Sequence, residues 1–137
     1  MPVSNSYKGF KDLECWKKGR ELRIKISTLV KRFPTEERYK LSSQIIRASR
    51  SITNNMAEGY GRFTYSDTRH FFIQARGSVT ETIDHLIIAF DEKYISQEEL
   101  TELEIICESI FKLINGYIGY LEKQKPITNS QSQIPNS

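Results

Sequence analysis

The chain has few of the residues that build disulfides, metal sites or membrane spans. Its 137 residues include only 2 cysteines and 2 histidines, and Cys15 and Cys107 lie far apart without a CxxC or Cys/His spacing. Neither a zinc site nor a disulfide framework is therefore predicted. Apolar runs are only a few residues long, far short of the roughly 18–20 that span a bilayer, and Met1–Ser6 lacks an apolar signal core. We expect a cytoplasmic protein without a membrane segment.

Glycine and proline are also scarce, at 7 and 4 residues, and they leave four long uninterrupted segments. Within each segment apolar residues recur at steps of three and four, the period of a helix with one buried side. No stretch alternates apolar and polar residues in the manner of a strand. The predicted helices cover residues 11–33, about 35 or 39 to 59, 66–92 and 96–123, and the third is expected to be the longest.

The segments between these helices are short. Pro34 ends the first helix, Gly59 and Gly61 end the second, and Ser96 with Glu99 has the spacing of a capping box at the start of the fourth. Short connections place successive helices antiparallel. The sequence therefore predicts one all-α domain, an antiparallel up-and-down four-helix bundle over residues 11–123. A flexible segment (1–10) precedes it and a disordered tail (124–137) follows it.

The second predicted helix carries a polar line beside its apolar stripe. The residues of this line recur at three- and four-residue spacing, so their side chains lie along one side of the helix. They are Gln44, Arg47, Ser51, Asn54, Asn55 and Glu58. A third line on the same helix consists of the mostly small residues Ile46, Ser49, Thr53 and Ala57. Three distinct lines indicate that the helix is contacted from more than one side.

Apolar residues also exceed what one bundle face requires. The third predicted helix places Ile73, Gly77 and Ile88 behind its main stripe, and the fourth is apolar over about half its circumference. Contiguous apolar patches point to association, so we expect a homo-oligomer. The alternative is that Ile73 and Ile88 are exposed on a monomer.

Charge is unevenly distributed along the chain. Residues 1–76 contain 16 Lys or Arg and 7 Asp or Glu, whereas residues 77–137 contain 4 and 10. The two halves either attract one another within or between subunits, or the basic half binds phosphates. The candidate phosphate-binding residues are Lys17, Lys18, Arg20, Arg23, Lys31, Arg32, Arg50, Arg62, Arg69 and Arg76. No sequence-reading module is present, so binding would depend on backbone charge and shape.

Nothing in the sequence predicts catalysis. His70 and His85 are too far apart to form a ligand pair, and the single Glu81/His85 spacing is not the paired Glu-x-x-His of a di-iron bundle. The run Gly59–Arg62 lacks the lysine of a phosphate loop and is explained by helix termination. We assign no catalytic residue, no metal and no cofactor.

One combination of motifs resembles a known family. The run from Gln44 to Arg62, followed by Phe72, Ala75, Gly77, Ser78 and Glu81, is similar to the four-helix bundle proteins also called 23S ribosomal RNA intervening-sequence proteins. The similarity covers roughly residues 10–120. It implies a bacterial protein and an antiparallel four-helix bundle that assembles as a homopentameric ring. A more distant likeness in fold, to the accessory protein of diversity-generating retroelements, implies a reverse transcriptase and nucleic acid as partners.

The resemblance also adds two residues to the polar line. The family's characteristic positions map onto that line and onto Ser78 and Glu81 of the facing helix. We define the polar network as Gln44, Arg47, Ser51, Asn54, Asn55, Glu58, Ser78 and Glu81. It is interpreted as a buried hydrogen-bond network between helices or subunits, and the alternative is a ligand or nucleic-acid site.

Together these observations predict a non-enzymatic, oligomeric, all-helical protein. Its expected role is to bind RNA or DNA, or to scaffold a nucleic-acid-processing partner, through a basic surface. The competing hypothesis is a purely protein-binding assembly module in which charge polarity serves subunit docking.

Overall fold

The computed structural model describes the backbone of residues 9–133 and the side chains up to Gln124. Four long helices dominate it: α2 (Glu14–Leu29), α3 (Leu41–Tyr60), α4 (Tyr65–Asp91) and α5 (Gln97–Gln133). Three short 3-10 helices accompany them: η1 (Phe10–Asp12), η2 (Val30–Arg32) and η3 (Thr35–Glu37). Over this described range there is no strand, as predicted.

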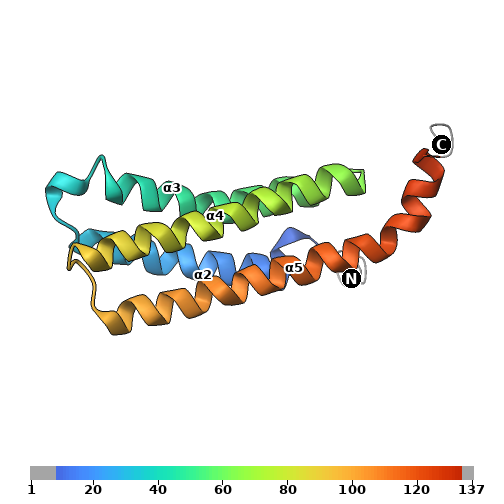
Figure 1. The fold of residues 1–137 in the computed structure, drawn as a ribbon. Helices are drawn as coiled ribbons and strands as arrows, with labels where there is room; N and C mark the ends of the chain where they lie inside the picture. Colours follow the sequence, from blue (N-terminus) through green and yellow to red (C-terminus); the bar gives the residue numbers. More distant parts are fainter. Residues whose placement is uncertain (1–8, 134–137) are drawn as a thin grey trace, which may run out of the picture.

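Each long helix packs against two others. α2 contacts α3 and α5, and α4 contacts the same two helices from the opposite side. Successive helices run in opposite directions (Figure 1). The all-helical up-and-down bundle is therefore confirmed. None of the helices in the described part is long and apolar enough to cross a membrane.

Local sequence explains where the helices begin. Thr64 Oγ1 accepts a hydrogen bond from the Asp67 amide at 3.1 Å and caps α4. The predicted capping box of α5 is present, because the Ser96 amide donates to Glu99 at 2.8 Å and the Glu99 amide donates to Ser96 Oγ at 3.1 Å. α3 uses a more distant partner, because Glu37 accepts from the Leu41 amide at 3.2 Å.

The turn between α4 and α5 ends α4 with a left-handed residue. Lys93 has φ of 67°, and the amide of Tyr94 donates to the carbonyl oxygen of Ala89 at 2.9 Å. This is the hydrogen-bond pattern of a Schellman cap, at a position where glycine is usual. A lysine there costs about 1 kcal/mol relative to glycine.

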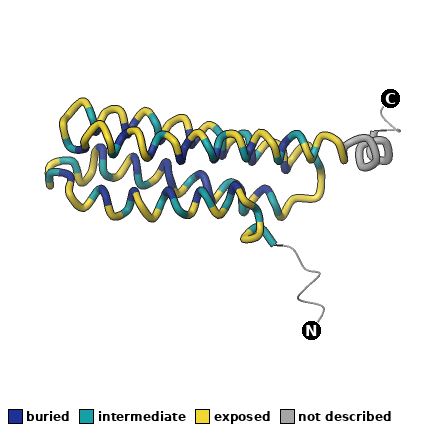
Figure 2. Tube along the Cα trace, turned by 90° about the horizontal axis from the view of Figure 1, so that it is seen from below, coloured by how far each residue is buried: buried dark blue, intermediate teal, exposed yellow. Residues whose placement is uncertain are grey.

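The core lies along the predicted apolar stripes. Phe72, Leu22, Ile26, Ile45 and Ile52 are fully buried, and the buried positions in Figure 2 follow the helix sides that face one another. Both cysteines are free and buried, and burial raises the pKa of Cys15 to about 11 and that of Cys107 to about 12. They act as small apolar residues.

The identity of the longest helix and the end of α5 differ from the prediction. The expectation that the third helix would be the longest is wrong, because α5 has 37 residues and α4 has 27. α5 continues to Gln133, past the Lys123 boundary predicted from periodicity. Periodicity marks the part of a helix with one apolar side, whereas the backbone hydrogen bonds that set its length leave no apolar pattern in the sequence. Residues 1–8 and 134–137, within the expected flexible end segments, lie outside the described residues.

Candidate nucleic-acid interface

The exposed side of the α2–α3 pair carries arginine and lysine residues. Positions 20, 23, 27 and 31 follow helical spacing on α2 and η2, and positions 46, 50, 53 and 57 do so on α3. We define the α2–α3 face by these residues, all of which except the buried Thr53 are exposed or partly exposed: Arg20, Arg23, Ser27, Lys31, Ile46, Arg50, Thr53 and Ala57. Arg23 joins its two halves, because its Nε donates to Thr53 Oγ1 at 3.1 Å.

No carboxylate belongs to this face. Glu14 and Glu21 are the only acidic residues of α2, and the helical period places both on the side of the helix opposite Arg23. They pair with Lys17 and Lys18 at 3.4 and 3.3 Å. The single acidic residue of α3, Glu58, pairs with Arg62. The cations of the face therefore have no acidic neighbour along their own helices' outer side.

A hollow of about 320 Å³ lies at the end of this face near Pro34. Its lining combines two cations, Lys31 and Arg38, with the hydroxyls of Thr35, Ser42 and Ser43. Its remaining lining residues are apolar: Val30, Phe33, Pro34 and Ile46. Cations and hydroxyl donors without a carboxylate suit a phosphate group.

The structure divides the ten candidate phosphate-binding residues into two groups. Arg20, Lys31, Arg50 and Arg69 are exposed, and Arg23 is half-buried against α3. The other five are held by partners within the chain. Lys17, Lys18, Arg32 and Arg62 form ion pairs with Glu14, Glu21, Glu99 and Glu58, and Arg76 donates to Asn115 at 2.7 Å.

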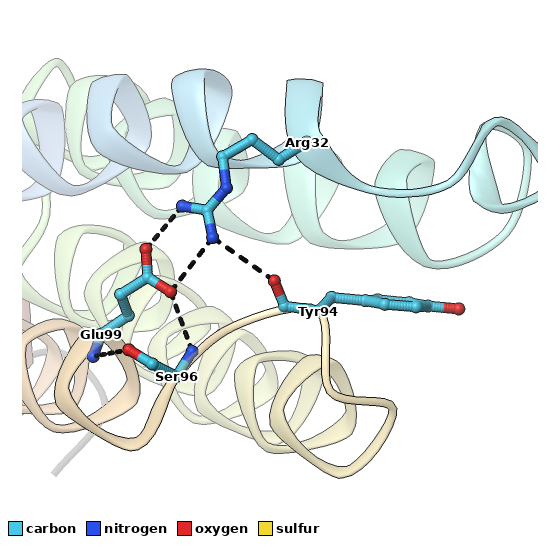
Figure 3. Close-up of polar contacts among 4 residues, drawn as sticks. All are labelled: Arg32, Tyr94, Ser96 and Glu99. Atoms are coloured by element: carbon cyan, nitrogen blue, oxygen red, sulfur yellow. Dashed lines mark hydrogen bonds and ion pairs between the residues drawn. The ribbon is translucent and has the colours of Figure 1, made fainter.

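Arg32 takes part in the most extensive of these contacts (Figure 3). Its two terminal nitrogens bind the two carboxylate oxygens of Glu99, and Nη2 also donates to the Tyr94 carbonyl oxygen at 3.5 Å. The Arg32 guanidinium and the capping hydrogen bond from Ser96 lower the pKa of Glu99 to about 2. One carboxylate thus caps α5 and ties it to η2, a link that spacing within one helix did not predict.

The polar network forms only in part. Ser51 Oγ accepts hydrogen bonds from Ser78 Oγ and Asn55 Nδ2, both at 2.9 Å, and so connects α3 with α4. Glu81 contacts His85 at 3.2 Å one turn further along α4, and Glu58 binds Arg62. Gln44, Arg47 and Asn54 are exposed and lie outside this cluster. The structure therefore brings together Ser51, Asn55 and Ser78 and separates the other five.

His85 lies on α4 one turn from Glu81. Its side chain is buried, and Nδ1 has no hydrogen-bond partner. No group of three His, Cys, Asp or Glu side chains in the part that the structure describes could hold a metal. One ring nitrogen beside one half-exposed carboxylate is too few ligands for a metal site.

The small-residue line of α3 has its partner within the same chain. Ser49 and Thr53 are buried, and a Cβ at Gly19 of α2 would lie 3.0 Å from Thr53 Cγ2. Ile73 packs against the core, whereas Ile88 remains 37% exposed. The prediction that α3 is contacted from more than one side is therefore confirmed, and α2 of the same chain supplies the contact with this line.

Comparison with known proteins gives a family and a fold. A family model described as 23S rRNA-intervening sequence protein matches residues 11–116. A crystal structure of a protein of unknown function from the S23 ribosomal protein family of Bacteroides thetaiotaomicron VPI-5482 is similar, with 24% identity and a TM-score of 0.71. The similarity covers 77% of this chain and 95% of that one. No curated protein matches.

Proposed function

Because the chain belongs to the 23S rRNA-intervening sequence protein family, we propose that it binds the sugar–phosphate backbone of RNA through the α2–α3 face, without catalysing a reaction. The observation that carries the proposal is the co-alignment of Arg20, Arg23, Lys31 and Arg50 on a surface that has no carboxylate. Such a surface attracts phosphates and releases their counterions. The hollow near Pro34 provides hydroxyl donors beside Lys31 of this face and beside Arg38.

The contacts of this face favour recognition of charge and shape. Its donors are cations and hydroxyls on rigid helices, which is the composition of phosphate-positioning surfaces. Arg23 is fixed by Thr53, whereas Arg20 and Arg50 are exposed, so the latter two are suited to substitution without disturbing the core. Binding through them should depend strongly on salt and weakly on base sequence.

Fluorescence anisotropy with a labelled oligouridine RNA tests the proposal. Affinity should fall steeply between about 50 and 200 mM salt. The double variant Arg20→Gln/Arg50→Gln should bind more weakly and with a shallower salt dependence, by about 0.7 in log–log slope per lost phosphate contact. Lys112→Gln is the matched control, because Lys112 is an exposed cation on α5, outside the α2–α3 face. It should leave affinity unchanged.

Two results would overturn this function. Absence of binding at low salt would remove RNA as the ligand. Equal losses in the double variant and in Lys112→Gln would show that the α2–α3 face has no special role.

A second candidate function is an assembly module made of several copies, a pentameric ring being the arrangement that the resemblance implies. It is favoured by large apolar side chains on the outer sides of α2, α4 and α5: Ile24 is 50% exposed, Ile87 38%, Ile88 37% and Ile105 60%. Light scattering after gel filtration tests it, because a 16.0 kDa species would exclude assembly. An assembly that binds no RNA would favour docking of a partner protein.

A further inference from the structure

A second cavity, unrelated to the α2–α3 face, lies at the end of the bundle where α3 turns into α4. We define the aromatic loop pocket by its lining residues, which enclose about 420 Å³: Tyr60, Arg62, Phe63, Thr64, Tyr65, Thr68, Tyr117, Tyr120, Leu121 and Gln124. Five of these ten residues are aromatic. They come from the end of α3, the loop, the start of α4 and the middle of α5, which meet at one end of the molecule (Figure 1).

A row of rings leads from the core to this pocket. Phe72 is fully buried and lies 4.7 Å from the ring of Tyr117. Tyr117 in turn stacks on Tyr120 at 6.0 Å with 25° between the planes. Tyr120 is 56% exposed, so the row of rings ends in one that packs against Tyr117 on one face and is accessible to solvent. Another flat ring could extend the stack.

The loop adds an aromatic side chain that the described part of the chain leaves uncovered. Phe63 is 100% exposed. A fully exposed phenylalanine gains nothing from burial in the folded chain, and exposed aromatic residues are enriched where proteins bind partners. Because Phe63 and Tyr120 line the same cavity, a planar group entering it meets rings from two elements.

Cations accompany these rings. The Arg62 guanidinium lies 4.7 Å over the Phe71 ring and pairs with Glu58, so its position at the pocket is fixed by two contacts. Arg69 and Lys123 are exposed, about one helical turn from Tyr65 and Tyr120 respectively. The hydroxyls of Thr64 and Thr68 and the amide of Gln124 supply polar groups in the lining.

We infer that the aromatic loop pocket binds an unpaired base of single-stranded RNA, with the base stacked on Tyr120 and Phe63 and its phosphate near Arg62. This inference rests on the proposed RNA binding and adds a base-binding site to it. The combination of accessible rings, nearby cations and polar edge groups is the composition of sites for single-stranded nucleic acid. The cavity volume falls in the range of small-ligand sites and suits one nucleotide.

The test compares oligouridine RNA with an abasic oligomer that has the same number of phosphates. The wild-type protein should bind the oligouridine more tightly. Tyr120→Leu and Phe63→Leu should each weaken oligouridine binding about 5- to 150-fold, the range for loss of one stacked base, without changing the affinity for the abasic oligomer. Tyr120→Phe keeps the ring and should retain binding. Ile105→Ala is the control, because Ile105 is a 60% exposed apolar residue of α5 outside both the aromatic loop pocket and the α2–α3 face.

The outcomes separate this inference from the proposed function. Equal binding of the two oligomers by the wild-type protein would overturn the base pocket and leave backbone binding intact. Equal losses in Tyr120→Leu and Ile105→Ala would also overturn it, by showing a nonspecific effect of removing exposed apolar side chains. Failure to bind either oligomer at low salt would overturn both proposals. Circular dichroism verifies that each variant is folded, which exposed positions 63 and 120 should permit.

Discussion

Substituting Gly59 by alanine tests how closely α3 and α4 pack. A Cβ at Gly59 would lie 2.7 Å from Phe71 Cβ and 3.1 Å from Phe72 Cδ1. Phe71 Cβ is attached directly to the backbone of α4, so a rotamer change cannot relieve the overlap and the two helices must separate. Overpacking of this kind lowers the unfolding free energy by up to about 3 kcal/mol, and the higher helix propensity of alanine offsets about 1 kcal/mol of this loss. The expected net loss is about 2 kcal/mol.

Urea unfolding followed by circular dichroism measures this loss. A melting temperature lower by roughly 5–10 °C should accompany it. Gly77→Ala is the matched control, because Gly77 is an exposed glycine of α4 with no atom within 4 Å of an added Cβ. It should raise the stability of the folded chain by about 1 kcal/mol. If Gly59→Ala stabilises the protein as much as Gly77→Ala does, the close approach of α3 and α4 is refuted.

Three further predictions concern helix ends and the core. The lowered pKa of Glu99, about 2 against the ordinary 4.5, means that its contribution is complete above pH 4.5 and is lost as the pH falls towards 2. Because the pair with Arg32 is largely exposed, this contribution to the unfolding free energy is about 1 kcal/mol. The variant Glu99→Gln keeps a capping side chain but cannot titrate. Its unfolding free energy, measured by urea titration, should therefore lose this decrease at acid pH. Identical pH profiles for the two proteins would contradict it. Lys93→Gly should raise the unfolding free energy by about 1 kcal/mol, and a decrease would argue against the left-handed cap. Cys15 and Cys107 should resist iodoacetamide at pH 8 in the native protein and react in urea, as mass spectrometry would show; labelling under native conditions would contradict their burial.

The fold was predictable because its signals are local. The apolar period of each helix and the Ser96/Glu99 capping box involve residues within a few turns of one another, and the structure confirms both. The length of α5 was not predictable in the same way. Its continuation past Lys123 involves backbone hydrogen bonds, which leave no apolar pattern in the sequence.

The candidate site was predictable only as a set of residue types. The sequence named Arg20, Arg23, Lys31 and Arg32 together as candidate phosphate-binding residues, but it could not show that Glu99, far away in the chain, holds Arg32. Such pairings depend on which helices become neighbours. The aromatic loop pocket was missed for the same reason, because Tyr117 and Tyr120 join Phe63 only when α5 folds back beside the α3–α4 turn.

Which helices become neighbours also decides which apolar surface is left for assembly with a second copy. The small-residue line of α3 predicted contact from a further side of the helix, and Gly19 and Arg23 of α2 supply that contact within the same chain. In the described residues the exposed large apolar side chains are four isoleucines and three aromatic residues: Ile24, Ile87, Ile88, Ile105, Tyr39, Phe63 and Tyr120. Single exposed apolar residues are ordinary on a monomer. A stable interface needs about 800 Å² from each partner, so an assembly must bury polar surface beside these residues. The outer side of α4 around Gly77 and Ile88 is a surface that a neighbouring backbone could approach closely. If it does, Gly77→Ala should stabilise the folded chain while weakening association, a combination that a monomer cannot produce.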